Sequence, residues 1–190
     1  MAEAEDGRHV LVHLGCGAKD KSRLPAPLNG PGWREIRVDL DPTHGPDIVA
    51  SIVHVPALAD DVADLVWCAH CLEHLFAHEV PRALGESLRL LKPGARLILI
   101  VPDGMTAAAL VAADRADETI YDSPAGPVTA LDMLYGHAPA LAQGAMAMAH
   151  RTCFTRARLA RLLQQAGFEA VVVSRQQKTY ELVAQARKPR

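Results

Sequence analysis

Short apolar runs alternate with longer amphipathic stretches along this chain, and this alternation constrains the fold more than any other feature of the sequence. It is typical of an α/β domain in which helices cover an open, mostly parallel sheet. The run Arg96 to Val101 (RLILIV) is apolar at nearly every position, as expected of a central strand covered on both faces. The link at 175–178 is too short for a parallel crossover, so the last strand is predicted to run antiparallel. The predicted strands are 9–14, 34–40, 47–50, 63–68, 96–101, 168–174 and 179–186.

Two amphipathic helices are predicted between these strands. The first covers 72–91 and has a leucine-rich face, although Pro81 indicates that it begins near His78, after a separate turn. The second covers 156–166, follows a capping threonine and stops at a glycine.

Length and composition indicate one globular domain that covers residues 1–190. A chain of 190 residues, 49% apolar and 22% charged, can bury a core without a metal or disulfide. Its four cysteines are therefore expected to be free thiols. Residues 18–32 hold too many prolines and glycines for a long regular helix, whereas the alanine-rich residues 103–150 are expected to contain helices.

The charge balance argues against a polyanionic partner. Twenty basic and 22 acidic residues give a formal charge of −2, whereas DNA or RNA binding needs clustered lysines and arginines. No apolar run approaches the roughly 20 residues that span a bilayer, and the first ten residues lack the pattern of a signal peptide. We therefore expect a cytoplasmic protein that binds neither nucleic acid nor membrane.

A glycine pair follows the first predicted strand, and an acid follows the second. Open sheets bind ligands at the carboxyl ends of their strands, and Gly15 and Gly17 let a ligand approach the backbone there. Asp39 lies 22 residues after Gly17, a spacing typical of acids that bind the hydroxyls of a ribose. A dinucleotide fold needs a third glycine where this chain has Asp20, so an adenosyl ligand without phosphates is favoured. The other interpretation is a simple turn beside a solvated acid.

Five segments occur in the order and spacing of a known family. They are VHLGCG (12–17), VDLDP (38–42), ADLVWCAHCLEHL (63–75), LKPGARLILIVPD (91–103) and LARLLQQAGFEAV (159–171). Together they resemble class I S-adenosylmethionine-dependent methyltransferases, most closely the small predicted methyltransferases of the type 11-like group. The resemblance implies a Rossmann-like, three-layer α/β sandwich around a mostly parallel seven-stranded sheet with the last strand antiparallel. It also implies that 103–150 is a substrate-lid insertion in the single methyltransferase domain.

The same resemblance implies S-adenosylmethionine as the cofactor. Gly15 and Gly17 would pack against its methionine part, whereas Asp39 would hold the ribose hydroxyls. Ser51 stands where the family often has an acid that binds adenine, so the Ser51 hydroxyl or the local backbone would take that role. The predicted cofactor-binding residues are Leu14, Gly15, Cys16, Gly17, Asp39, Leu40, Ser51, Ile52 and His70.

Methyl transfer from a sulfonium is an in-line displacement, so positioning of the acceptor can supply much of the catalysis. A general base is needed only where the acceptor is a hydroxyl or a protonated amine. The predicted catalytic residues are His70, His150 and Tyr135. Asp103 and His137 are weaker choices, because Asp103 is better suited to order the loop after its strand.

The run CAHCLEHLFAH (68–78) contains two metal-like patterns. Its two cysteines and last two histidines lie too close together for a structural zinc site, which usually joins two separated ligand pairs. His70, Glu73 and His74 also spell H-x-x-E-H, but that motif needs both histidines on one helical face and a third ligand downstream. We therefore expect no metal and assign Glu73 and His74 to hydrogen bonds that fix the turn.

These observations favour a methyltransferase that acts on a small-molecule or glycan-type acceptor, as a monomer or a homodimer. One alternative is a non-catalytic S-adenosylmethionine-binding subunit that pairs with another protein. Another is a nicotinamide-dependent dehydrogenase, which the residue at position 20 disfavours.

Overall fold

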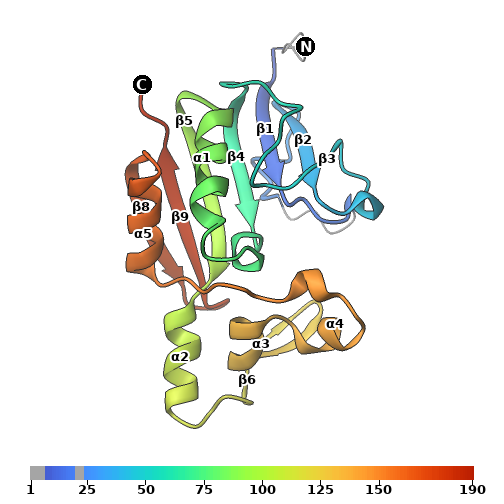
Figure 1. Cartoon of the computed structure of the whole chain (residues 1–190), viewed down its shortest axis with the longest axis vertical. Coiled ribbons are helices and arrows are strands. Elements are labelled where there is room, and N and C mark those ends of the chain that lie inside the picture. Colours follow the sequence, from blue (N-terminus) through green and yellow to red (C-terminus); the bar gives the residue numbers. More distant parts are fainter. Residues whose placement is uncertain (1–6, 20–23) are drawn as a thin grey trace.

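A seven-stranded sheet forms the centre of the protein, seen here in a computed structural model that describes residues 7–19 and 24–190 (Figure 1). Its strand order is β3-β2-β1-β4-β5-β9-β8, and β9 is antiparallel to both of its neighbours while the other pairs are parallel. The predicted fold class and the antiparallel last strand are thus confirmed. The strands are β1 (His9–Leu14), β2 (Trp33–Asp39), β3 (Ile48–Val49), β4 (Ala63–Ala69), β5 (Leu91–Pro102), β8 (Glu169–Gln176) and β9 (Glu181–Arg187).

Two helices, α1 (Val80–Leu90) and α5 (Arg156–Gln165), pack on one face of the sheet, in front of it in Figure 1. Their apolar side chains share the main core with the inward residues of β1, β4, β5, β8 and β9. Helix α1 begins at Val80, close to the start near His78 that Pro81 predicted, and Leu72–His74 form the expected separate turn, a 3₁₀ helix, η3.

An irregular segment covers part of the opposite face. In the described residues this layer contains no long helix between β1 and β2, as the prolines predicted. Asp20, on which the argument against a dinucleotide rests, lies outside the described residues. The second core holds Leu11, Leu24, Leu65 and Trp67, with Leu28 and Trp33 packed against it.

Residues 103–150 form a compact group beneath the sheet, at the end toward which β1 and β4 point (Figure 1). The expected helices are present, whereas the hairpin of β6 and β7 was not predicted. The group has its own small core of Ala107, Val128, Ala130 and Met133. Its elements are α2 (Gly104–Ala112), β6 (Thr119–Ser123), β7 (Gly126–Thr129), α3 (Ala130–Tyr135), α4 (Ala138–Ala142) and η4 (Met146–Met148).

Two further expectations concern the cysteines and membrane-spanning helices. All four cysteines are free, as predicted. None of the helices in the described residues combines the length and apolar character needed to cross a bilayer.

An ion-pair network ties the loop between β3 and β4 to helix α1. The Arg89 guanidinium donates to Glu86 at 2.6 Å, to Asp60 at 2.6 Å and to the Val55 carbonyl at 3.2 Å. Glu86 is buried and also accepts from the Val55 amide at 2.7 Å. The hydrogen bonds from Arg89 lower the pKa of Glu86 below its usual range.

Arg89→Ala should therefore reduce the free energy of unfolding by about 2–4 kcal/mol, because it leaves a buried carboxylate without its partner. The exposed Arg82, on the same helix, is the matched control, and Arg82→Ala should change stability by less than about 0.5 kcal/mol. Since the pKa of Glu86 is depressed by folding, its contribution is complete above the unfolded value and is lost as pH falls through the folded value. Urea unfolding at pH 7 and at pH 4 measures both effects; equal losses in the two variants would contradict this role.

Candidate functional site

Three neighbouring strands, β2, β1 and β4, end side by side, and the glycine turn after β1 lies between the other two ends. Gly15 and Gly17 both have left-handed backbones, with φ of +67° and +61°. The Gly17 amide donates to Asp39 Oδ2 at 2.8 Å. The structure therefore brings together the glycine turn and the acid that the sequence singled out.

The two glycines have different structural roles in this turn. A Cβ on Gly15 would lie 1.7 Å from the Cys71 Sγ, so its missing side chain allows the turns after β1 and β4 to touch. A Cβ on Gly17 would meet no atom of residues 7–19 or 24–190 within 4 Å. The open space beside the second glycine is where a ligand can approach the main chain.

Asp39 is largely buried, with a side chain 13% exposed. Its Oδ1 accepts from the Asp41 amide at 2.9 Å and lies 3.2 Å from His44 Nδ1. Arg37, two residues earlier on β2, donates to the Gly17 carbonyl at 2.6 Å and so fixes the same turn. Sequence reasoning missed Arg37, because a charged residue in an alternating strand normally points to solvent.

The other predicted cofactor residues surround this turn in different ways. Leu40 is 69% exposed just after β2, whereas Leu14 and Ile52 lie in the core and offer a ligand only their backbone. Cys16 is buried, and burial raises the pKa of its thiol to about 11. Ser51 follows β3, and its hydroxyl accepts from the Val53 amide at 3.3 Å.

His70 ends β4 in a left-handed conformation with φ of 54°, which is strained for a residue other than glycine. Its Nε2 donates to Glu181 at 2.9 Å and its Nδ1 lies 3.4 Å from Glu73 Oε1. Burial alone would lower the pKa of His70, but these two carboxylates outweigh it and raise that pKa to about 10. The ring is therefore an imidazolium at neutral pH and is not free to accept a proton. Sequence reasoning also missed Glu181, which comes from the far end of the chain.

The other two predicted catalytic residues, Tyr135 and His150, are in contact through their backbones. The His150 amide donates to the Tyr135 carbonyl at 3.0 Å, but the Tyr135 side chain is 64% exposed. Burial lowers the pKa of His150, so that its ring is neutral at pH 7. Asp103 caps α2 by accepting from the Met105 amide at 3.1 Å, as the sequence suggested.

The sequence matches the model of a methyltransferase domain family over residues 20–173, which begins just after the glycine turn. A search of the curated proteins finds no match. Three similar solved structures show the fold.

One is a possible exported protein from Bordetella parapertussis, 16% identical, with a TM-score of 0.61; the match covers 96% of this chain but only 62% of that one. Another is a 1,6-didemethyltoxoflavin-N1-methyltransferase from Burkholderia thailandensis, solved with S-adenosylhomocysteine; it is 19% identical, covers 96% of this chain and 72% of its own, and has a TM-score of 0.58. The third is an S-adenosylmethionine-dependent methyltransferase from Methanosarcina mazei, which is 17% identical. The match covers 96% of this chain and 93% of that one, with a TM-score of 0.64.

Proposed function

The chain belongs to a family of S-adenosylmethionine-dependent methyltransferases, the methyltransferase domain family, and from this premise we propose that it transfers a methyl group to a small-molecule or glycan-type acceptor. The observation that carries the proposal is the 2.8 Å contact between the Gly17 amide and Asp39 at the ends of adjacent strands. A carboxylate held at that place is suited to bind vicinal hydroxyls.

The described residues fit an adenosyl cofactor. The space beside Gly17 admits a ligand to the main chain, and Asp39 is fixed close to it. Leu40 offers an exposed apolar surface for an adenine ring, and Ser51 follows the next strand with a hydroxyl. We assign the cofactor to the turn 14–17, to these strand ends and to the backbone of Ile52.

When bound, S-adenosylmethionine supplies a methyl group that is already electrophilic, because it is carried by a sulfonium. The protein then has to hold the acceptor in line and exclude water. We assign this task to residues 103–150, a lid inserted in the single domain, because they lie at the carboxyl ends of the strands (Figure 1). Exposed methionines at positions 105, 146 and 148 give this group an adaptable apolar surface.

We propose that neither His70 nor Tyr135 acts as a general base, because His70 is charged and Tyr135 is mostly exposed. His150 is neutral at pH 7 and stays a candidate base for an acceptor that must lose a proton. For other acceptors positioning supplies the catalysis, and His70, fixed between two carboxylates, is a positioning residue at the end of β4.

Calorimetric titration of the full chain with S-adenosylhomocysteine and with NADH tests the cofactor assignment. S-adenosylhomocysteine should bind with one site per chain, and NADH should bind at least tenfold more weakly. Preferential binding of NADH would support the dehydrogenase, and binding of neither would remove the basis of the proposal.

A second experiment separates an enzyme from a non-catalytic subunit. The protein is incubated with S-adenosylmethionine labelled in its methyl group and with fractionated small-molecule and glycan extracts. Transfer of label to a fraction that depends on the protein supports the enzyme. Cofactor binding without transfer to any fraction favours the partner subunit.

A further inference from the structure

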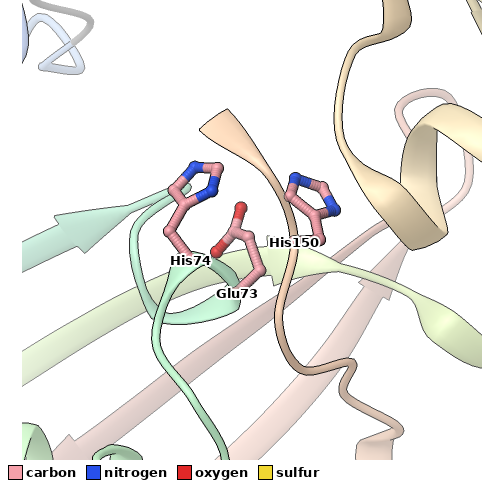
Figure 2. A group of neighbouring side chains, drawn as sticks. All are labelled: Glu73, His74 and His150. Carbon is pink, nitrogen blue, oxygen red and sulfur yellow. The ribbon is translucent and has the colours of Figure 1, made fainter. Parts of the chain in front are cut away.

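Three metal-ligating side chains meet where η3 contacts the end of the 103–150 segment (Figure 2). They are Glu73, His74 and His150, and one ligand atom from each lies within 4.8 Å of the others. Figure 2 shows the Glu73 carboxylate between the two imidazole rings. The rings themselves have centroids 5.1 Å apart.

Hydrogen bonds to main-chain carbonyls fix the tautomer of both rings. His74 Nδ1 lies 3.2 Å from the Ala149 carbonyl, and His150 Nδ1 lies 2.9 Å from the Met133 carbonyl. A carbonyl can only accept a hydrogen bond, so each Nδ1 carries the proton. In the neutral form of each ring, Nε2 therefore carries the lone pair, and this is the arrangement in which histidine binds metal ions in proteins.

The buried Glu73 carboxylate has one ion-pair contact and spare acceptor sites. The residue is 2% exposed, and within the described residues neither of its oxygens accepts a hydrogen bond of normal geometry. Its ion-pair partner is the His70 ring, with Nδ1 3.4 Å from Oε1, a contact longer than a normal hydrogen bond. A carboxylate has about four acceptor sites on its two oxygens, so this single contact leaves room for a metal ion.

The main chain holds the ligands in place. The amides of Arg151 and Thr152 both donate to the Glu73 carbonyl, at 2.8 and 3.2 Å. His150 is therefore fixed opposite η3, although it is distant in the sequence. The H-x-x-E-H pattern requires a further ligand downstream, and His150 lies in the right place for one. The first histidine of the pattern, His70, is outside the group because its ring is hydrogen-bonded to Glu181.

We propose that Glu73, His74 and His150 bind one divalent first-row transition-metal ion. Two imidazole nitrogens and a carboxylate favour such an ion over Mg²⁺ or Ca²⁺, which prefer oxygen ligands. An ion at about 2.1 Å from each atom requires ligand atoms about 3–3.5 Å apart, so the side chains close by about an ångström. Three protein ligands leave coordination positions open. We assign these open positions to an oxygen of the methyl acceptor. This assignment rests on the proposed function, whereas binding of the ion does not.

The test uses the full chain without a histidine tag, freed of metal with a chelator and then dialysed. Titration with Co²⁺, followed by visible absorption, and with Zn²⁺, followed by calorimetry, should each show one equivalent bound. Glu73→Gln keeps the shape of the side chain and should weaken binding at least tenfold, as should His150→Ala. Mg²⁺ should not compete.

His78→Ala is the matched control, because His78 is exposed in the same stretch and lies outside the group. It should bind Co²⁺ like the parent protein. Failure of the parent to bind either ion would overturn the proposal, and so would unchanged binding in Glu73→Gln. Circular dichroism checks folding, and if His150→Ala unfolds, the result with Glu73→Gln decides.

Titration of the same proteins with S-adenosylhomocysteine keeps this inference separate from the proposed function. The metal-free parent should bind it as the metal-loaded parent does. A parent that binds S-adenosylhomocysteine but neither metal ion would overturn the metal site alone, whereas a parent that binds metal but not S-adenosylhomocysteine would overturn the cofactor assignment alone.

Discussion

Gly17→Val should raise the dissociation constant of S-adenosylhomocysteine at least a hundredfold. A Cβ at this position has no atom of the described residues within 4 Å, so a branched side chain would fill the volume assigned to the cofactor. The backbone at φ +61° adds strain of about 1–2 kcal/mol, which the fold can tolerate. Calorimetry at neutral pH measures the affinity, and thermal unfolding checks that the variant is folded.

Gly144→Val is the matched control for the strain. Gly144 also has a positive φ, +89°, and its Cβ also meets nothing within 4 Å, but it lies between α4 and η4. It should bind S-adenosylhomocysteine with the parent affinity. Equal affinity in Gly17→Val and the parent would show that the turn does not face the cofactor.

Gly15→Ala should behave differently, because its Cβ would overlap the Cys71 thiol at 1.7 Å. The substitution should lower the thermal stability of the protein. It should weaken S-adenosylhomocysteine binding only because the turn is destabilised. Replacing Cys71 by alanine as well removes the overlapping sulfur and should restore much of the lost stability. A drop in melting temperature that the second change does not reduce would contradict this packing role.

The sheet and its order of elements could be predicted because their signals are local. An apolar run such as Arg96 to Val101 indicates a buried strand by itself, and the short link at 175–178 permits only an antiparallel turn. The glycine turn and Asp39 were also found, since each lies directly after a strand, and parallel strands bring their ends together.

What escaped prediction depends on contacts between distant residues. His150 lies near Glu73 because the amides of Arg151 and Thr152 donate to the Glu73 carbonyl, and no spacing in the sequence encodes these hydrogen bonds. His70 is hydrogen-bonded to Glu181, which is distant in the sequence. The local pattern of residues 68–78 therefore could not predict this partner. The hairpin of β6 and β7 was missed because its strands are short and contain a single buried residue, Val128, so they lack an apolar alternation.

Asp39→Asn should weaken the binding of S-adenosylhomocysteine by about 1.5–3 kcal/mol, or about 10- to 150-fold, through loss of charge-assisted hydrogen bonds. Asparagine keeps the shape of the side chain but replaces one acceptor oxygen by a donor. Because Asp39 also accepts from the Gly17 amide, part of the loss could come from a loosened turn rather than from the ribose.

A pair of ligands separates these two causes. The parent protein should bind S-adenosylhomocysteine much more tightly than its 2′,3′-dideoxy analogue, and Asp39→Asn should bind the two with nearly equal affinity, because the group that distinguishes them is gone. Asp41→Asn is the matched control, since Asp41 is an exposed acid in the same turn whose carboxylate binds Thr43. It should discriminate between the ligands as the parent does. If Asp39→Asn discriminates equally well, the carboxylate shapes the turn and does not hold the ribose.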